Sequence, residues 1–249
     1  NTEETYSSYH LLEDYLPPTG KDGIPILKRL DWNISDPFEI YSRIYPHFEN
    51  SFILESSAGP DELAKYTFLG FEPRAVLTLS DGVFRINGER EIEAQNPLGH
   101  LKTLERDFQD LQSTNSEKYL GGLVGYTSYD FVRYLEDLPS PYDNMQFPDL
   151  QMGLFLDGLV HRRDQGTLTY FSYDKDRSLK LKKLLHSSSE TNRKKFHMSK
   201  LESDFTREEF TSAIEEAKDY IYSGDIYQTV LSRKLSGRFG GDQFDAYRK

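Results

Sequence analysis

The residue in this chain whose type and position most directly suggest chemistry is one glutamine, Gln228. It lies in the segment Gly224-Asp225-Ile226-Tyr227-Gln228-Thr229-Val230-Leu231-Ser232-Arg233. β-Branched and aromatic residues alternate there with a period of two, as in a β-strand, so Ile226, Gln228 and Val230 would share one face. Burying an unpaired amide costs about 1–3 kcal/mol. The glutamine is therefore either a structural residue, bonded to a loop or facing water, or a group that positions a substrate.

The residues before this segment predict the helix that positions it. Thr206-Arg207-Glu208-Glu209 has the form of a capping box, which marks the start of a helix. Gly224 is placed to end that helix, because glycine tolerates a positive φ just past the last turn. We therefore predict a helix between Thr206 and Gly224, followed by a strand. Its apolar face recurs at spacings of three and four residues and consists of Phe210, Ala213, Ile214, Ala217 and Ile221.

This order of helix, Gly-Asp-Ile-Tyr-Gln and Val-Leu-Ser-Arg resembles the start of the chorismate-binding domain in the chorismate-utilising enzymes. That family includes anthranilate synthase component I and aminodeoxychorismate synthase component I. Family members that add water carry a lysine at the position of Gln228, whose amine can act as a general base. Members that add ammonia carry glutamine, because ammonia is already a nucleophile and needs positioning more than deprotonation. The resemblance therefore assigns Gln228 as a catalytic residue and favours amination.

Two consecutive segments far upstream resemble the same family. Residues 52–56 (Phe-Ile-Leu-Glu-Ser) are similar to its Leu-Leu-Glu-Ser element, and residues 65–70 (Lys-Tyr-Thr-Phe-Leu-Gly) to the basic-Tyr-Ser-Phe run that follows. In anthranilate synthases the first element lines the feedback site for tryptophan. The alternative is a buried strand that ends in a polar turn. The resemblance implies a tryptophan-binding site at Leu54, Glu55, Ser56 and Lys65.

A third segment, residues 121–139, resembles the family pattern Gly-Gly-x-x-Gly-Tyr-x-Ser-Tyr-Asp-x-x-Arg-Tyr-x-Glu. Three glycines in an apolar run predict that another backbone approaches closely. A phosphate loop is excluded, because the lysine and Ser/Thr that it needs do not follow the glycines. Arg133 and Glu136 lie three residues apart, a spacing that predicts a surface ion pair on a short helix. We interpret the segment as scaffold.

The composition argues against several other classes of protein. The chain has 41 acidic and 30 basic residues and a formal net charge of −11, so binding to nucleic acid is not expected. It has no cysteine, and its six histidines show no metal-ligand spacing, which argues against disulfides and a zinc site. No apolar run approaches the roughly 18 residues of a transmembrane helix, and no signal peptide is recognisable. We expect a cytoplasmic protein without a membrane partner.

The predicted elements favour an α+β fold of antiparallel sheets with flanking helices. Helices are predicted from Asp36-Pro37 and over Leu98–Leu111. Hairpins are predicted around Asp81-Gly82, and between 154–162 and 167–173 around Asp164-Gln165-Gly166.

The predicted domain organisation has three parts. Residues 1–185 form an N-terminal domain of the anthranilate synthase type that carries the tryptophan-binding element. Residues 186–203 form a linker, and residues 204–249 begin the chorismate-binding domain.

As a whole, the resemblance implies anthranilate synthase component I, a lyase of tryptophan biosynthesis. Such an enzyme adds ammonia at C2 of chorismate and eliminates pyruvate. The implied cofactor is Mg²⁺ and the implied partner a glutamine amidotransferase subunit, with tryptophan as the inhibitor. The family's chains continue well beyond a segment like Asp245-Ala246-Tyr247-Arg248, and their magnesium-binding glutamates lie in that further half. We therefore expect this sequence to be a truncated part of such an enzyme that is inactive alone.

Two alternatives remain open from the sequence. Aminodeoxychorismate synthase component I shares the addition step but attaches nitrogen at C4 and retains the enolpyruvyl group. A non-catalytic module that binds an amino acid as a regulator would use the element at Leu54–Ser56 alone. Glutamates of the predicted 206–224 helix match no metal ligand of the family, and we assign them no metal role.

Overall fold

The computed structural model describes residues 11–17, 24–31, 36–55, 65–94, 96–112, 120–138, 147–187 and 194–248. The chain divides into two compact units between residues 188 and 189. Each unit is described by itself.

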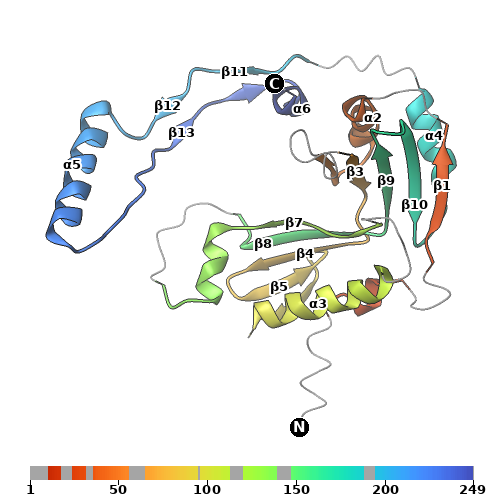
Figure 1. The fold of residues 1–249 in the computed structure, drawn as a ribbon, viewed down its shortest axis with the longest axis horizontal. Helices are drawn as coiled ribbons and strands as arrows, with labels where there is room; N and C mark the ends of the chain where they lie inside the picture. Colours follow the sequence, from red (N-terminus) through yellow and green to blue (C-terminus); the bar gives the residue numbers. More distant parts are fainter. Residues whose placement is uncertain are drawn as a thin grey trace, which may run out of the picture. The chain divides into compact units, whose positions relative to one another are not determined.

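The first unit holds two five-stranded antiparallel sheets (Figure 1). The first sheet has the order β1-β10-β9-β3-β2, and its strands are β1 Ile26–Leu30, β2 Ser51–Glu55, β3 Tyr66–Phe71, β9 Asp157–Arg162 and β10 Thr167–Ser172. The second sheet has the order β6-β5-β4-β8-β7, and its strands are β4 Ala75–Ser80, β5 Val83–Ile86, β6 Arg90–Glu93, β7 Gly122–Thr127 and β8 Leu150–Phe155.

Helices cover one face of each sheet (Figure 1). Helices α2 (Pro37–Ile44) and α4 (Ser178–His186) pack on the first sheet, and α3 (Pro97–Gln112) lies on the second. The Asp36 carboxylate caps α2 by accepting a hydrogen bond from the Phe38 backbone N–H at 2.9 Å. Short 3-10 helices span Glu13–Tyr15, Tyr45–His47 and Tyr129–Tyr134.

Two stretches of chain pass directly from one sheet into the other. Strand β3 leaves the first sheet and continues through residues 72–74 into β4 of the second, while β8 returns through Leu156 into β9. The passages lie side by side, because the Arg74 backbone N–H donates to the Leu154 carbonyl at 2.7 Å. Glu72 adopts a φ of 52° at the bend. The two sheets therefore share a corner made by strands that switch sheets.

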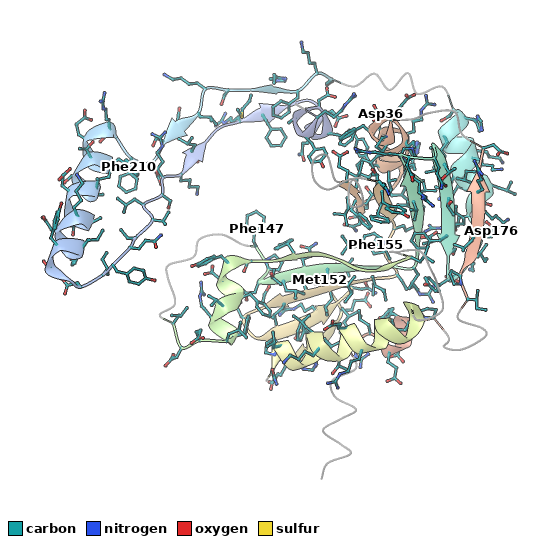
Figure 2. The ribbon with its side chains drawn as sticks, in the orientation of Figure 1. Asp36, Phe147, Met152, Phe155, Asp176 and Phe210 are labelled. Atoms are coloured by element: carbon teal, nitrogen blue, oxygen red, sulfur yellow. The ribbon has the colours of Figure 1, made fainter. Side chains whose placement is uncertain are left out.

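Glycines make room for an aromatic pair at this corner. The rings of Phe52 and Phe155 meet edge to face with centroids 4.7 Å apart, and Phe155 is labelled where the two sheets meet (Figure 2). A Cβ at Gly70 would lie 2.1 Å from the Phe52 ring, and one at Gly153 would lie 2.7 Å from the Phe155 ring. The glycine that ends the Lys-Tyr-Thr-Phe-Leu-Gly run is therefore required by packing.

A row of polar side chains crosses the first sheet at the end of β2. Glu55 lies directly opposite Thr67, and Thr67 lies opposite His161, so the three side chains share a face. Thr67 is 0% and His161 2% exposed. The Thr67 hydroxyl and both ring nitrogens of His161 find no hydrogen-bond partner among the described residues. Burial, and then the positive charge of Arg163, lower the pKa of the His161 imidazole and so favour its neutral form.

The second unit is an extended arrangement around one long helix. Helix α5 (Arg207–Ser223) is flanked by two short paired segments, in which β11 (His197–Met198) pairs with β14 (Phe239–Gly240) and β12 (Glu202–Ser203) pairs with β13 (Leu235–Ser236). Helix α6 spans Gln243–Tyr247. Phe244 is the buried hydrophobic side chain among the described residues 194–248. Most apolar side chains of this unit are therefore exposed or only partly covered.

Several predictions from the sequence are confirmed. Thr206 and Glu209 form the capping box, with Thr206 Oγ1 accepting from the Glu209 N–H at 3.2 Å, and Gly224 ends α5 with a φ of 82°. The hairpin at Asp81-Gly82 forms as predicted, as do α2 and α3. A backbone does approach the glycine run closely, because a Cβ at Gly121 would lie 2.7 Å from the Phe155 carbonyl oxygen. The α+β class is confirmed as well.

Other predictions are wrong. No strand forms at 226–231, because no described segment supplies hydrogen-bonding partners for a strand there. The predicted hairpin around Asp164-Gln165-Gly166 does form, between 157–162 and 167–172, but the strand predicted at 154–162 is two strands in different sheets, broken at Leu156. Arg133 pairs with Asp130 at 2.6 Å, a residue three positions before it, and not with Glu136. The linker over 186–203 stays a prediction. The boundary between the two units falls within it, and the short strands at 197–198 and 202–203 lie there too.

We predict that Gly70→Ala lowers the free energy of unfolding by about 1–3 kcal/mol, because the added methyl group overpacks the site of the Phe52 ring. Chemical denaturation of the 249-residue chain measures this loss. In a Phe52→Ala background the same substitution should cost much less, since the ring is gone. An equal loss in both backgrounds would contradict the packing explanation.

We predict that the chain loses stability through His161 as the pH falls below about 6.5, the pKa of an unperturbed histidine. The lowered pKa means that the unfolded state binds a proton where the folded state does not, so acid favours unfolding. Thermal unfolding at several pH values should show a steeper loss for the unsubstituted chain than for His161→Gln. Parallel pH profiles would show that His161 does not contribute.

Candidate functional site

The predicted tryptophan-binding element lies in the hairpin-like pair of β2 and β3. Glu55 is the last residue of β2, and Lys65 comes just before β3. Leu54 and Glu55 point to opposite faces of the sheet because successive strand residues alternate. Leu54 is 46% exposed, whereas the Glu55 side chain is 12% exposed. Ser56 lies outside the described residues.

Arg163, a residue that the sequence analysis did not single out, joins the two halves of this element. Its guanidinium Nη2 donates to the Glu55 carboxylate at 3.0 Å. Its backbone N–H donates to the Lys65 carbonyl at 2.8 Å. Arg163 follows β9 directly and belongs to the turn that leads into β10. One residue of a third segment therefore contacts both segments that resemble the family's tryptophan site.

The charged side chains at the ends of β2 and β3 are of the kind that could bind a zwitterionic ligand. The Glu55 carboxylate is partly buried and paired, and the Lys65 ammonium makes no ion pair among the described residues. A free ammonium can bind a carboxylate, and a carboxylate can bind an ammonium. Glu55 and Lys65 lie at the ends of adjacent antiparallel strands, since Glu55 pairs with Thr67. The arrangement is chemically compatible with the carboxylate and ammonium of an amino acid.

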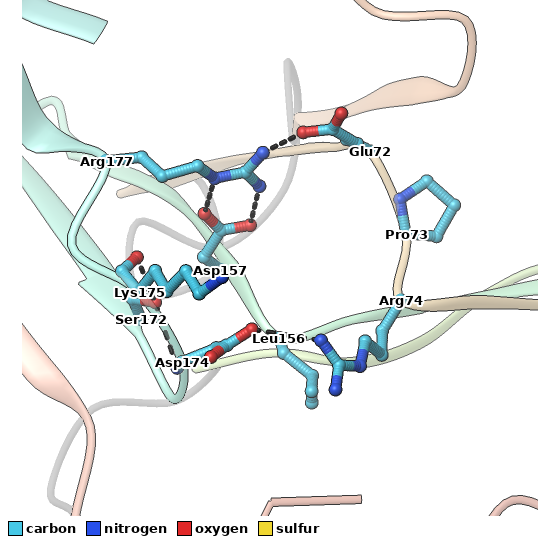
Figure 3. A pocket seen from close by; sticks show the side chains of 9 residues that line it. All are labelled: Glu72, Pro73, Arg74, Leu156, Asp157, Ser172, Asp174, Lys175 and Arg177. Atoms are coloured by element: carbon cyan, nitrogen blue, oxygen red, sulfur yellow. Dashed lines mark hydrogen bonds and ion pairs between the residues drawn. The ribbon is translucent and has the colours of Figure 1, made fainter. Parts of the chain in front are cut away.

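A second candidate is a cavity of about 290 Å³ at the corner between the sheets (Figure 3). The Arg177 guanidinium lines this cavity. It donates to both carboxylate oxygens of Asp157, at 2.6 and 2.8 Å, and forms an ion pair with Glu72. Tyr170, which is fully buried, donates to Asp157 at 3.1 Å, and Arg74 pairs with Asp174 at 3.1 Å. These charged side chains are paired with one another. The network therefore fixes the two passages between the sheets.

A cavity of about 280 Å³ lies beside the edge strand β7. Its apolar lining includes Phe52, Phe155 and Val124, and its polar lining includes Glu49 and Gln151. The glycine of β7 at position 125 lies against the backbone of β8 there, since a Cβ would collide with the Gln151 carbonyl oxygen. The third motif segment thus forms part of the wall. Its Tyr134 hydroxyl donates to Asp149 at 2.7 Å and accepts from the Gly82 N–H at 3.0 Å, which anchors it to the second sheet.

Gln228 lies in the second unit, beyond the end of α5, in an exposed segment without regular structure. The structure therefore does not bring Gln228 into a pocket with other described side chains of its unit. In the described part of the chain, no three His, Asp or Glu side chains are arranged to hold a metal ion. On α5, Glu209 completes the capping box and Glu215 pairs with Lys218 at 2.8 Å.

None of the described helices is both long enough and apolar enough to span a membrane.

Sequence reasoning missed Arg163 and the buried pair Thr67 and His161. Adjacent arginines at 162 and 163 before a turn look like a solvated surface, and nothing local distinguishes them. The contact between Arg163 and Glu55 joins residues 108 positions apart. Only the pairing of β3 with both β2 and β9 makes it possible.

Comparison with known proteins agrees with this architecture. The profile of the family described as chorismate binding enzyme matches residues 49–249. Anthranilate synthase component 1 of Methanothermobacter thermautotrophicus is 31% identical over 226 residues, which cover 90% of this chain and 46% of the relative. The same component of Thermus thermophilus is 32% identical over 251 residues, covering 90% of this chain and 50% of the relative. The chain thus spans about half the length of these relatives.

A solved structure shows the same fold. The crystal structure of anthranilate synthase component I from Streptococcus pneumoniae TIGR4 superposes with a TM-score of 0.61 at 22% sequence identity, covering 89% of this chain and 51% of that one. Because the family profile matches residues 49–249, most of the chain, the chain belongs to the chorismate-binding enzyme family.

Proposed function

We propose that this chain forms the first part of an anthranilate synthase component 1, the enzyme that makes anthranilate from chorismate and ammonia. The observation that carries the proposal is the match of 90% of the chain to that component at 31% identity. The glutamine at position 228, which follows the capped helix α5 and its terminal Gly224, supports amination over addition of water.

In the proposed reaction, ammonia forms a carbon–nitrogen bond at C2 of chorismate and the hydroxyl group at C4 leaves. Elimination of pyruvate then gives the aromatic amine. Gln228 would hold ammonia or the substrate by hydrogen bonds, since its neutral amide both donates and accepts. The ammonia would be supplied by a glutamine amidotransferase subunit. Mg²⁺ is proposed as the cofactor of the whole enzyme, with ligands other than the described residues.

The second unit supports the view that α5 and the segment after it normally pack against more protein. Tyr222, Tyr227 and Val230 are 85%, 93% and 82% exposed. Apolar surface of this kind is costly in water, and an isolated two-stranded ribbon is marginally stable. We propose that the remainder of a chorismate-binding domain covers these side chains.

Regulation is proposed at the β2–β3 element. Tryptophan would place its ammonium toward Glu55 and its carboxylate toward Lys65 and Ser56. It can inhibit only if it binds one conformation of the enzyme better than another. Aminodeoxychorismate synthase remains a weaker candidate, because the relatives reported above are anthranilate synthases.

We predict that the purified 249-residue chain makes no anthranilate from chorismate, ammonium and Mg²⁺, because it spans only about half the length of the anthranilate synthase relatives. Anthranilate fluorescence gives a sensitive assay. A matched preparation of a full-length component 1 relative should be active under the same conditions. Turnover by the 249-residue chain above the background of a Gln228→Leu preparation would overturn this prediction.

We also predict that replacing Ser56 with Phe, in a component 1 enzyme that carries this sequence, relieves inhibition by tryptophan by roughly tenfold or more. The bulky ring would block the polar end of the proposed site, and losing one charge-assisted hydrogen bond is worth about 1.5–3 kcal/mol. Initial rates at increasing tryptophan concentration measure this, and kcat should stay nearly unchanged. Unaltered sensitivity to tryptophan would refute the assignment of the element.

A further inference from the structure

We propose that Arg163 is a positioning residue that holds the tryptophan-binding element in its binding conformation. This inference rests on the proposed regulatory function of the β2–β3 element. Arg163 makes two different contacts with that element. Its side chain pairs with Glu55 at 3.0 Å, and its backbone N–H donates to the Lys65 carbonyl at 2.8 Å.

The two contacts fix the distance between the segments on which the ligand would act. Glu55 ends β2 and Lys65 precedes β3, and the nine residues between them, 56–64, lie outside the described part. The pairing of β2 with β3 ends where Glu55 lies opposite Thr67, and Lys65 precedes Thr67 by two residues. Beyond the last paired residues of these strands, Arg163 adds one contact to the β2 end, through Glu55, and one to the β3 end, through Lys65.

The electrostatic surroundings make Arg163 the residue suited to this role. The Glu55 side chain is 12% exposed, and a carboxylate that far from water needs a partner. The other titratable group on that buried row is His161, whose pKa is lowered by burial and by the charge of Arg163. Asp36, which caps α2, acts on His161 in the opposite direction. Among the described residues, the ion-pair partner of Glu55 is therefore Arg163.

Neighbouring Arg162 provides a matched control. It is the preceding residue, its side chain is 28% exposed against 34% for Arg163, and it carries the same charge. Its guanidinium pairs with Asp164 at 3.1 Å and lies over the Tyr66 ring at 5.3 Å. Removing Arg162 therefore removes a similar charge and area without removing the contact with Glu55.

Preorganisation explains the expected effect on binding. A ligand that must first order the ends of β2 and β3 loses affinity by the cost of that ordering. A partly exposed ion pair contributes about 0.2–1 kcal/mol, or up to roughly fivefold in an equilibrium constant. The Arg163→Gln substitution should therefore weaken tryptophan binding by several-fold, and Arg163→Lys should restore part of the loss because it keeps the charge.

Hydrogen exchange of the 249-residue chain, measured with and without saturating L-tryptophan, tests the inference. Without ligand, Arg163→Gln should speed exchange of the amides of 51–55 and 66–68 by roughly two- to fivefold. Arg162→Gln should leave them within about twofold. With tryptophan, the concentration that gives half-maximal protection of these amides should rise in Arg163→Gln, fall back toward the original value in Arg163→Lys, and stay unchanged in Arg162→Gln.

The outcomes separate this inference from the proposed function. Unchanged exchange in Arg163→Gln, or equal effects of both glutamine variants, would overturn the role of Arg163 while leaving tryptophan regulation in place. Faster exchange in Arg163→Gln with no tryptophan protection even in the unsubstituted chain would overturn the effector assignment, and with it the regulatory role of Arg163. Faster exchange together with a selective loss of tryptophan protection would support both.

Discussion

The N-terminal unit depends on two passages of chain that cross from one sheet to the other at a shared corner. β3 continues into β4 and β8 into β9, so the central strands of both sheets are covalently continuous in pairs. Where a strand bends from one sheet into the other, its backbone N–H and C=O groups lose their partners in the sheet and need hydrogen-bond partners at the bend. The Arg74 N–H and Leu154 carbonyl satisfy each other, and the Tyr173 N–H donates to Leu156. The two sheets thus cannot move apart without breaking this corner.

Side chains reinforce the same corner in two ways. On one side, Phe52 and Phe155 pack over Gly70 and Gly153. On the other, Arg177 holds Asp157 and Glu72, one from each passage. A charged pair this enclosed is costly to desolvate, and its value lies in fixing geometry and in the penalty for leaving one partner unpaired. The proposed effector site lies at the ends of β2 and β3, and Arg163, which contacts it, follows β9. Both β3 and β9 continue into the corner, so the corner fixes two of the strands beside the site.

Local structure was predictable from the sequence wherever a short pattern determines it. The capping box at Thr206, the helix-ending Gly224 and the Asp81-Gly82 hairpin each depend on neighbouring residues and are as predicted. The break at Leu156 was not predictable, because an uninterrupted apolar run reads as one strand and the bend depends on packing against Glu72–Arg74. The strand expected at 226–231 needs partners that no described segment provides. The pairing of Glu55 with Arg163 depends on strand order, which no local pattern reveals. The catalytic role of Gln228 rests on the resemblance of its sequence segment to the family, and the structure adds only that this residue lies after α5.

The central claim is that this sequence carries the ammonia-specific start of a chorismate-binding domain. The most direct measurement is product analysis of a hybrid in which residues 1–249 replace the matching half of Thermus thermophilus component 1, with Gln228 retained or changed to lysine. With chorismate, ammonium and Mg²⁺, the hybrid with Gln228 should make anthranilate. Gln228→Lys should reduce that rate by roughly a hundredfold, as expected when a reactant loses its positioning group, and should yield a hydroxylated product instead. Anthranilate formation at an unchanged rate in the lysine variant would contradict the claim.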